Sequence, residues 1–264
     1  MLKRFLFALL GLLLIAPAGA QTPLRVAAAA DLEPVLPPVL AQFETSTGIH
    51  VEATYQASAV LTTQILNGAP FDLFLSADLS FPKRLIDAHV ADASGVANTA
   101  GSTDSSTPII YAKGTLVLWE RKDSHLPPPS LALLSDPNLK RLAIANPDRA
   151  PYGRAAVAAL TSLKLYDTLK PRIVTAENIA QTAQFVDSGN ADAGLISLTS
   201  AMTTRLTANG TYFVIPRDLY PPIEQGAVIV TATSQREAAH KLLDFLLSAP
   251  VQAELAKSGL TPVR

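Results

Sequence analysis

Short apolar runs alternate with segments of helical period along most of the chain, and this alternation constrains the fold more than any other feature. The first apolar run predicts a strand over 24–29, followed by a helix that begins after Asp31 and ends near Gly48. Pro37 and Pro38 fall inside that helix, so we expect a kink or a late helix start there. Further strands are expected at 51–55, 71–76, 141–145, 172–174, 193–197 and 227–231. Further helices are expected at 58–66, 153–164, 179–188, 200–206, 235–247 and 250–257. This repeated order predicts an α/β fold with mainly parallel strands.

Two segments interrupt the alternation and predict a division into two lobes. Residues 94–107 are rich in Gly, Ser, Thr and Asp, and the apolar stretch 109–120 after them is long enough to pass between lobes. Residues 216–222 form the matching break. We expect one lobe from residues 21–117 plus 218–264 and a second from 118–217. The only tryptophan, Trp119, would lie at the end of the first crossing and respond to lobe closure.

The first twenty residues are typical of a secretory signal peptide. Lys3 and Arg4 precede an apolar run at 5–16, and Ala-Gly-Ala at 18–20 is a cleavage site of small residues. The run is shorter than the ~20 residues needed to span a bilayer. We therefore expect residues 1–20 to be a signal peptide cleaved after Ala20. Because the chain has no cysteine, it cannot carry a lipid on one, and a soluble periplasmic protein is expected.

Composition and missing motifs argue against several classes of function. The 264 residues include 21 Lys and Arg against 22 Asp and Glu, so no strongly basic surface is expected for nucleic acid. Without cysteine there is no thiolate nucleophile and no sulfur-based metal site. Phosphate-binding, dinucleotide and esterase motifs are absent from the sequence, and its four histidines form no metal-binding pattern. Acidic pairs such as Asp72 with Asp78, or Glu177 with Asp187, could serve as acid and base, although capping carboxylates are commoner. These absences argue against an enzyme and against a bound cofactor.

The junctions between strand ends and helix starts carry the positive signal. The first N–H groups of a helix lack intrahelical partners, and the helix dipole places partial positive charge there, so such junctions bind anions. In open α/β sheets they also line the crevice where ligands bind. Candidate junctions occur at residues 30–31, 57–59, 151–153 and 178–180.

Several motifs in this framework resemble one family. The most specific is Asn-Gly-Ala-Pro-Phe-Asp-Leu-Phe-Leu-Ser-Ala-Asp at 67–78. It stands with Ala-Ala-Ala-Ala-Asp-Leu at 27–32, Ile-Ala-Asn-Pro-Asp-Arg-Ala-Pro-Tyr-Gly at 144–153 and Ala-Glu-Asn-Ile at 176–179. Together they resemble the periplasmic molybdate-binding proteins of ABC transporters. The resemblance implies a two-lobed type II periplasmic binding fold whose hinge is crossed twice and whose cleft closes over a tetrahedral oxyanion.

The resemblance also implies a set of ligand residues. Ser58 would donate its hydroxyl and amide, while Tyr152 and Ile179 would donate backbone N–H groups. Asp31 stands where relatives often carry Ser or Asn, and Ser197 where some carry a Tyr. Asp31, Ala30 and Ser197 complete the predicted site. The only metal would be the molybdenum of the ligand itself, and the partner would be a membrane permease, with the protein acting as a monomer.

Two questions stay open on sequence alone. A carboxylate beside a dianion should repel it, so we expect Asp31 to cap its own helix with its side chain turned away from the ligand. Alternatively, Asp31 could accept a proton from phosphate. A receptor for sulfate or phosphate is therefore the nearest rival to a molybdate or tungstate receptor. An envelope enzyme on the same fold is a more distant alternative.

Overall fold

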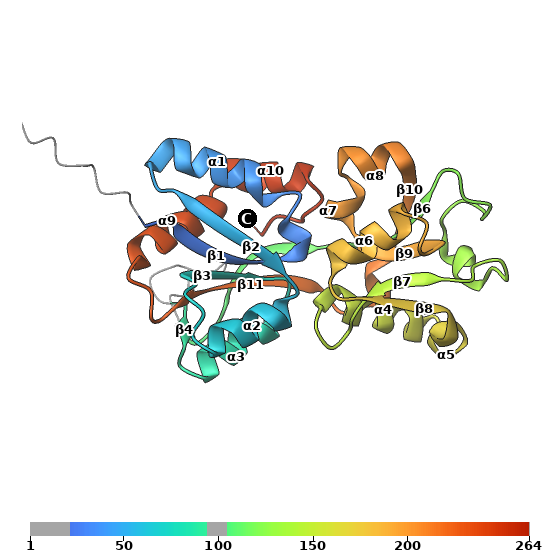
Figure 1. The fold of residues 1–264 in the computed structure, drawn as a ribbon, viewed down its shortest axis with the longest axis horizontal. Helices are drawn as coiled ribbons and strands as arrows, with labels where there is room; N and C mark the ends of the chain where they lie inside the picture. The colour runs from blue at the N-terminus through green and yellow to red at the C-terminus, as the bar shows by residue number, and fades with distance from the viewer. Residues whose placement is uncertain (1–21, 94–104, 264) are drawn as a thin grey trace, which may run out of the picture.

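The computed structural model describes residues 22–93 and 105–263, which form two lobes lying side by side, each built on one sheet (Figure 1). The first sheet has the strand order β2-β1-β3-β11-β4, and β5 also pairs with β11. Its strands are β1 (Leu24–Ala29), β2 (Val51–Gln56), β3 (Leu73–Ser76), β4 (Ala91–Asp92), β5 (Ile109–Gly114) and β11 (Ile223–Val230). The expected signal peptide over 1–20 lies outside the described residues.

Helices cover both faces of the first sheet (Figure 1). On one face lie α1 (Leu36–Thr47), α9 (Arg236–Leu246) and α10 (Ala249–Lys257); on the other lie α2 (Ser58–Leu66) and α3 (Ser80–Asp87). Alternate residues of β1 serve the two faces. Val26 and Ala28 pack in the core beneath α1 and α9, whereas Ala27 packs with α2 and α3. Burial on both faces explains why this strand is apolar apart from the exposed Arg25 near its start.

The second sheet has the order β10-β6-β9-β7-β8. Its strands are β6 (Leu116–Arg121), β7 (Leu142–Ala145), β8 (Ile173–Ala176), β9 (Ala193–Ser197) and β10 (Gly210–Val214). The helices of this lobe are α4 (Pro151–Ser162), α5 (Tyr166–Leu169), α6 (Ile179–Asp187), α7 (Leu198–Ala201) and α8 (Thr204–Asn209). Short 3-10 turns are η1 (Ala30–Leu32), η2 (Leu131–Ser135), η3 (Lys170–Arg172) and η4 (Arg217–Leu219). In Figure 1, α4 and α6 lie on opposite faces of the sheet.

The prediction of mainly parallel strands is right for only part of each sheet. The strands of the βα units pair in parallel: β1 with β2 and β3, and β7 with β8 and β9. The strands that lead the chain between the sheets pair antiparallel, β5 with β11 and β10 with β6. Antiparallel pairs also connect them to the parallel strands, β11 to β3 in the first sheet and β6 to β9 in the second. The α/β class and the two-lobed arrangement predicted from sequence are confirmed.

The chain passes between the sheets twice. The first crossing is a single residue, Thr115, between the end of β5 at Gly114 and the start of β6 at Leu116. The return runs from the end of β10 at Val214 to the start of β11 at Ile223. The apolar stretch 109–120 is therefore two strands in two different sheets.

Trp119 does not lie at the crossing, so that expectation was wrong. The side chain is fully buried within the second sheet, where it packs in a core with Ala143 and Val186. It lies against Gly210, where an added Cβ would come within 2.0 Å of the indole ring. A rigid core position of this kind gives no structural reason for Trp119 to report lobe closure.

The first helix begins late, which is one of the two outcomes expected from its prolines. After β1 the chain makes the short turn η1, and α1 begins only at Leu36, with Pro37 and Pro38 in its first turn. Proline is tolerated there because those N–H groups would have no intrahelical partner. Gly48 then ends α1 with φ of 72°, as predicted. Among the described residues, no helix has the length and apolar character needed to cross a bilayer.

Candidate functional site

A small cavity lies where the carboxyl ends of β1, β2 and β3 meet helix starts of the second lobe. The space between the surrounding atoms is small, about 200 Å³ including the part that is open to solvent. The lining residues are Ala29, Ala30, Asp31, Gln56, Ala57, Ser58, Ala77, Ala150, Pro151, Tyr152, Asn178 and Ile179. The structure thus brings together five of the six predicted site residues, Ser197 being the exception.

Three helix starts converge on this cavity. Ser58 and Ile179 are the first residues of α2 and α6, and Tyr152 is the second residue of α4. None of the described residues offers an acceptor to the backbone N–H of Ser58, Tyr152 or Ile179. Each helix end also contributes partial positive charge. Three unpaired donors with this polarity are the kind of groups that bind oxyanions.

The Ser58 hydroxyl is set up as a further donor. The side chain is almost fully buried, and its Oγ accepts a hydrogen bond from the backbone N–H of Ala77 at 3.2 Å. Its own O–H has no acceptor among the described residues, so it is free to donate to a ligand. Ser58 does not cap its own helix, because Ala57 is the N-cap residue.

The expectation that Asp31 caps its own helix was wrong. The turn η1 begins after Ala29 with no side-chain cap, and the fully buried Asp31 carboxylate accepts a hydrogen bond from Gln225 Nε2 at 2.5 Å. Its other oxygen, Oδ1, and the buried Tyr152 hydroxyl have no hydrogen-bond partner in the described part of the chain. Desolvation raises the pKa of Asp31 to about 6. Burial, followed by the nearby Asp31 charge, raises the pKa of the Tyr152 hydroxyl well above its ordinary value.

Gln225 is the residue near the site that sequence reasoning missed. It lies in β11, which begins at Ile223 and not at 227 as expected. The sequence offered one signal, a Gln-Gly pair immediately before an apolar run. If such a run is a buried strand, its glutamine is buried as well, as Gln225 is, and needs a polar partner. That partner is Asp31, 194 residues earlier in the chain.

Ser197 does not line the cavity. Its Oγ accepts a hydrogen bond from the Ser200 N–H at 3.2 Å and thereby caps α7. The neighbouring Thr199 hydroxyl donates instead to the backbone carbonyl of Asp31, at 2.8 Å. This polar cluster joins the two lobes beside the cavity without entering it.

The two acidic pairs considered as acid and base are not pairs in space. Asp72 precedes β3 and Asp78 follows it, so the strand separates them. Glu177 and Asp187 lie at opposite ends of α6. Within residues 22–93 and 105–263, no group of three or more His, Cys, Asp or Glu side chains is placed to hold a metal ion.

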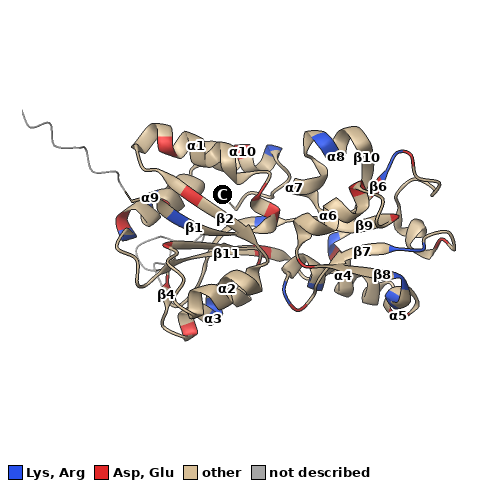
Figure 2. Cartoon of the chain, viewed as in Figure 1, with Lys and Arg blue, Asp and Glu red and all other residues tan. Residues whose placement is uncertain are grey.

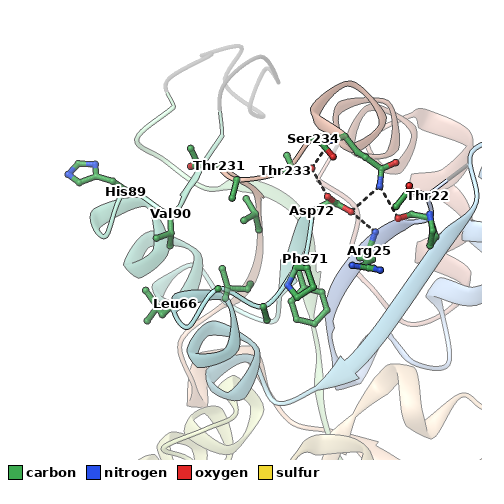
Figure 3. Close-up of a pocket in the computed structure, with 18 residues that line it drawn as sticks. Thr22, Arg25, Leu66, Phe71, Asp72, His89, Val90, Thr231, Thr233 and Ser234 are labelled. Atoms are coloured by element: carbon green, nitrogen blue, oxygen red, sulfur yellow. Dashed lines mark hydrogen bonds between the residues drawn. The ribbon is translucent and has the colours of Figure 1, made fainter.

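A much larger cavity lies at the opposite end of the first sheet (Figure 3). It contains about 1180 Å³ of space between atoms and is open to solvent. The polar centre of its wall is Asp72, whose carboxylate accepts hydrogen bonds from Arg25 N at 2.7 Å, Thr233 Oγ1 at 2.5 Å and Gln235 Nε2 at 3.3 Å. The protein itself therefore satisfies this buried carboxylate.

A two-lobed α/β fold with anion-binding helix starts between the lobes defines the class of solute-binding proteins. Residues 24–261 match the family of bacterial extracellular solute-binding proteins, and the chain belongs to that family.

Its relatives include the molybdate-binding protein ModA of Azotobacter vinelandii, 36% identical over 94% of this chain and 93% of the relative. ModA of Rhodobacter capsulatus is 33% identical over 92% of this chain and 89% of that protein. The solved structure of the Azotobacter vinelandii periplasmic molybdate-binding protein matches with a TM-score of 0.80 at 30% identity, covering 90% of this chain and 98% of that one. The sulfate-binding protein SubI of Mycobacterium tuberculosis, at 17% identity and a TM-score of 0.77, shares the fold. The resemblance seen in the sequence is confirmed.

Proposed function

We propose that this protein captures molybdate, and also tungstate, between its lobes and delivers it to the membrane permease of an ABC importer. The observation that carries the proposal is the convergence of three unpaired helix N–H groups and the free Ser58 O–H on one small cavity. The names of the two ModA relatives, which span nearly the whole chain, support molybdate as the ligand.

Neutral donors explain how a dianion would be held. None of the cavity-lining residues is Lys or Arg, so binding would depend on hydrogen bonds and helix dipoles instead of a formal positive charge. Each charge-assisted hydrogen bond contributes roughly 1.5–3 kcal/mol net. Selectivity against sulfate would rest on cavity size, because the two oxyanions share charge and shape.

The proposal includes the cellular setting and the division into lobes. A signal peptide cleaved after Ala20 would export a monomeric, cofactor-free binding protein to the periplasm. The proposed lobes are residues 21–117 plus 218–264 and residues 118–217; the changes of sheet at Thr115 and between Val214 and Ile223 support this division. Acidic and basic residues are spread over both lobes (Figure 2), in keeping with a small anion as the partner instead of nucleic acid.

Calorimetry of the mature protein against molybdate, tungstate, sulfate and phosphate tests the proposal. Molybdate and tungstate should bind tightly, and sulfate at least about a hundredfold more weakly, a gap of ~2.7 kcal/mol. Equal affinity for sulfate would contradict selective molybdate capture.

Phosphate is the second candidate because of one observation, the unpartnered Asp31 Oδ1. At neutral pH phosphate carries a proton that this oxygen could accept. Tighter binding of phosphate than of molybdate would favour that candidate. Turnover of a bound small anion, followed with the purified protein, would instead indicate an enzyme on this fold.

A further inference from the structure

Arg154 of the second lobe makes two contacts with the first lobe, and neither involves the cavity. Its guanidinium forms an ion pair with the carboxylate of Asp78, which follows β3. The same group lies 5.1 Å from the centre of the Phe81 ring, in α3. One side chain on α4 therefore bridges the lobes by a charge pair and a cation–π contact.

We propose that Arg154 is a latch: it holds the two lobes closed and strengthens oxyanion binding without touching the oxyanion. This inference rests on the proposed function for its ligand. Arg154 is absent from the residues that line the cavity, although Pro151 and Tyr152 of the same helix belong to them. It lines instead a separate depression with Asp78, Pro221 and Pro222.

The first-lobe side of the latch is held in position before the lobes meet. Asp78 Oδ1 accepts a hydrogen bond from the Phe81 N–H at 3.2 Å, and Oδ2 accepts one from the Ser80 hydroxyl at 2.7 Å. The Asp78 side chain is only 17% exposed, so its charge is screened less than that of a typical surface carboxylate. When the lobes close, the Arg154 side chain is therefore the main group that loses conformational freedom.

Contacts formed only in the closed state raise the apparent affinity for any ligand bound between the lobes. Removing the latch should therefore shift the lobes toward the open form and speed ligand release. The effect should be moderate, because other contacts also join the lobes, such as the bond from Ala59 N–H to the Arg149 carbonyl at 3.1 Å.

A direct electrostatic effect would give a different pattern. If Arg154 merely attracted the dianion and Asp78 repelled it, Asp78→Asn would tighten binding. A latch requires the opposite sign, so that both Arg154→Ala and Asp78→Asn weaken binding. Asparagine still offers an oxygen to the Phe81 N–H, which preserves the local turn.

The matched control is Arg149→Ala. Arg149 forms an ion pair with Glu177, and both residues belong to the second lobe. The Arg149 side chain is 48% exposed against 42% for Arg154, and truncating it leaves its backbone carbonyl in place. The Arg149→Ala substitution therefore removes a similarly exposed charge near the cleft without breaking a contact between side chains of the two lobes.

The test measures the molybdate dissociation constant and release rate for wild type, Arg154→Ala, Asp78→Asn, the double variant and Arg149→Ala. We expect each latch variant to weaken binding about three- to tenfold through faster release, with the double variant no weaker than the single ones. Arg149→Ala should stay within about twofold of wild type. Tighter binding by Asp78→Asn, additive effects, or unchanged binding by Arg154→Ala would overturn the latch.

A second measurement tests the latch without a ligand. Because the chain has no cysteine, spin labels at Arg84→Cys in α3 and Thr168→Cys in α5 report the distance between the lobes. The ligand-free protein should show a closed population that falls in Arg154→Ala and persists in Arg149→Ala. If no closed population exists, or if Arg154→Ala leaves it unchanged, the latch is wrong. If wild type binds none of the four oxyanions, the proposed function fails while this distance still decides the latch.

Discussion

The two cavities at opposite ends of the first sheet, one of them shared with the second lobe, differ in how their polar groups are satisfied. At the amino ends of the strands, the large cavity is centred on Asp72, whose carboxylate accepts three hydrogen bonds from the protein (Figure 3). At the carboxyl ends, the small cavity leaves the N–H groups of Ser58, Tyr152 and Ile179 without acceptors among the described residues. A buried polar group without a partner costs roughly 1–3 kcal/mol. Unpaired donors, and not volume, therefore distinguish a binding site from a surface hollow.

The largest expected effect comes from removing one N–H from the small cavity. Ile179→Pro deletes the donor without breaking the helix, because proline is favoured at the first position of a helix and the extended backbone of Asn178, with ψ of 178°, accepts a following proline. We expect molybdate affinity to fall on the order of 100-fold, the loss of a charge-assisted bond. Ile179→Ala, which trims the side chain but keeps the N–H, is the control in the same calorimetric titration. Equal losses in both variants would assign the effect to packing.

Ser58→Ala should weaken molybdate binding by roughly 1–3 kcal/mol, because it removes a buried hydroxyl donor. The Ala77 N–H also loses its acceptor, so thermal stability should fall by about 1 kcal/mol. Thr62→Val is the matched control, since Thr62 donates to the Ser58 carbonyl from the same helix and does not line the cavity. A stability loss with an unchanged dissociation constant would remove Ser58 from the site.

Asp31 should make binding depend on pH. Its pKa is raised by burial from 3.8 to about 6, and the groups facing it are Gln225 and the tyrosines Tyr152 and Tyr111. A bound dianion would favour the protonated carboxyl further, so molybdate affinity should fall as pH rises from 6 to 8, by up to about tenfold per pH unit. Asp31→Asn should abolish this slope. A steep slope that persists in Asp31→Asn would assign the titration to another group.

The same shift predicts a change in stability. A carboxyl with a raised native pKa favours folding when protonated, so its contribution to stability falls as pH rises from about 4 to about 6. At pH 8 the Asp31→Asn variant should be the more stable protein, by up to on the order of 3 kcal/mol. Below about pH 4 the two proteins should converge, since Asp31 is then protonated in both the folded and the unfolded states. Thermal unfolding without ligand at the two pH values measures the difference.

The smallest effect on binding should come from Asp72→Asn in the large cavity. The substitution replaces a carboxylate oxygen with a donor where only donors surround it, so stability should fall by about 1–3 kcal/mol. Molybdate affinity should stay within about twofold of wild type. A large loss of affinity would mean that the two cavities are coupled, and the contrast between them would no longer hold.

The sequence predicted those parts of the molecule that depend on local chemistry. The βα units, the late helix start that places Pro37 and Pro38 in the first turn, and the gathering of three helix starts at one site all follow from periodicity and from the unpaired groups at helix ends. Motif resemblance then selected the class of ligand.

What the sequence did not predict depends on contacts between distant residues. The Asp31 carboxylate was expected to cap its own turn, but the structure pairs it with Gln225 across 194 positions. The Ser58 hydroxyl accepts a hydrogen bond from the Ala77 N–H, 19 positions later in the chain, which the sequence did not indicate. Trp119 is placed deep in a sheet by the antiparallel pairing of β6 with β9 and β10. The local sequence is compatible with several hydrogen-bond partners for a polar side chain, and tertiary packing determines which of them it meets.

The positions of the two crossings also determine how the second lobe could be excised or replaced. Gly114 and Ile223 face one another as cross-strand neighbours in the first sheet, and Val117 faces Val214 in the second. The entire second lobe is thus an insertion whose two ends emerge side by side from a β-ladder. Excising it would leave β5 and β11 as a hairpin that a two-residue turn such as Asn-Gly can close. A homologous lobe grafted between Gly114 and Ile223 would therefore leave every strand of the first sheet in place.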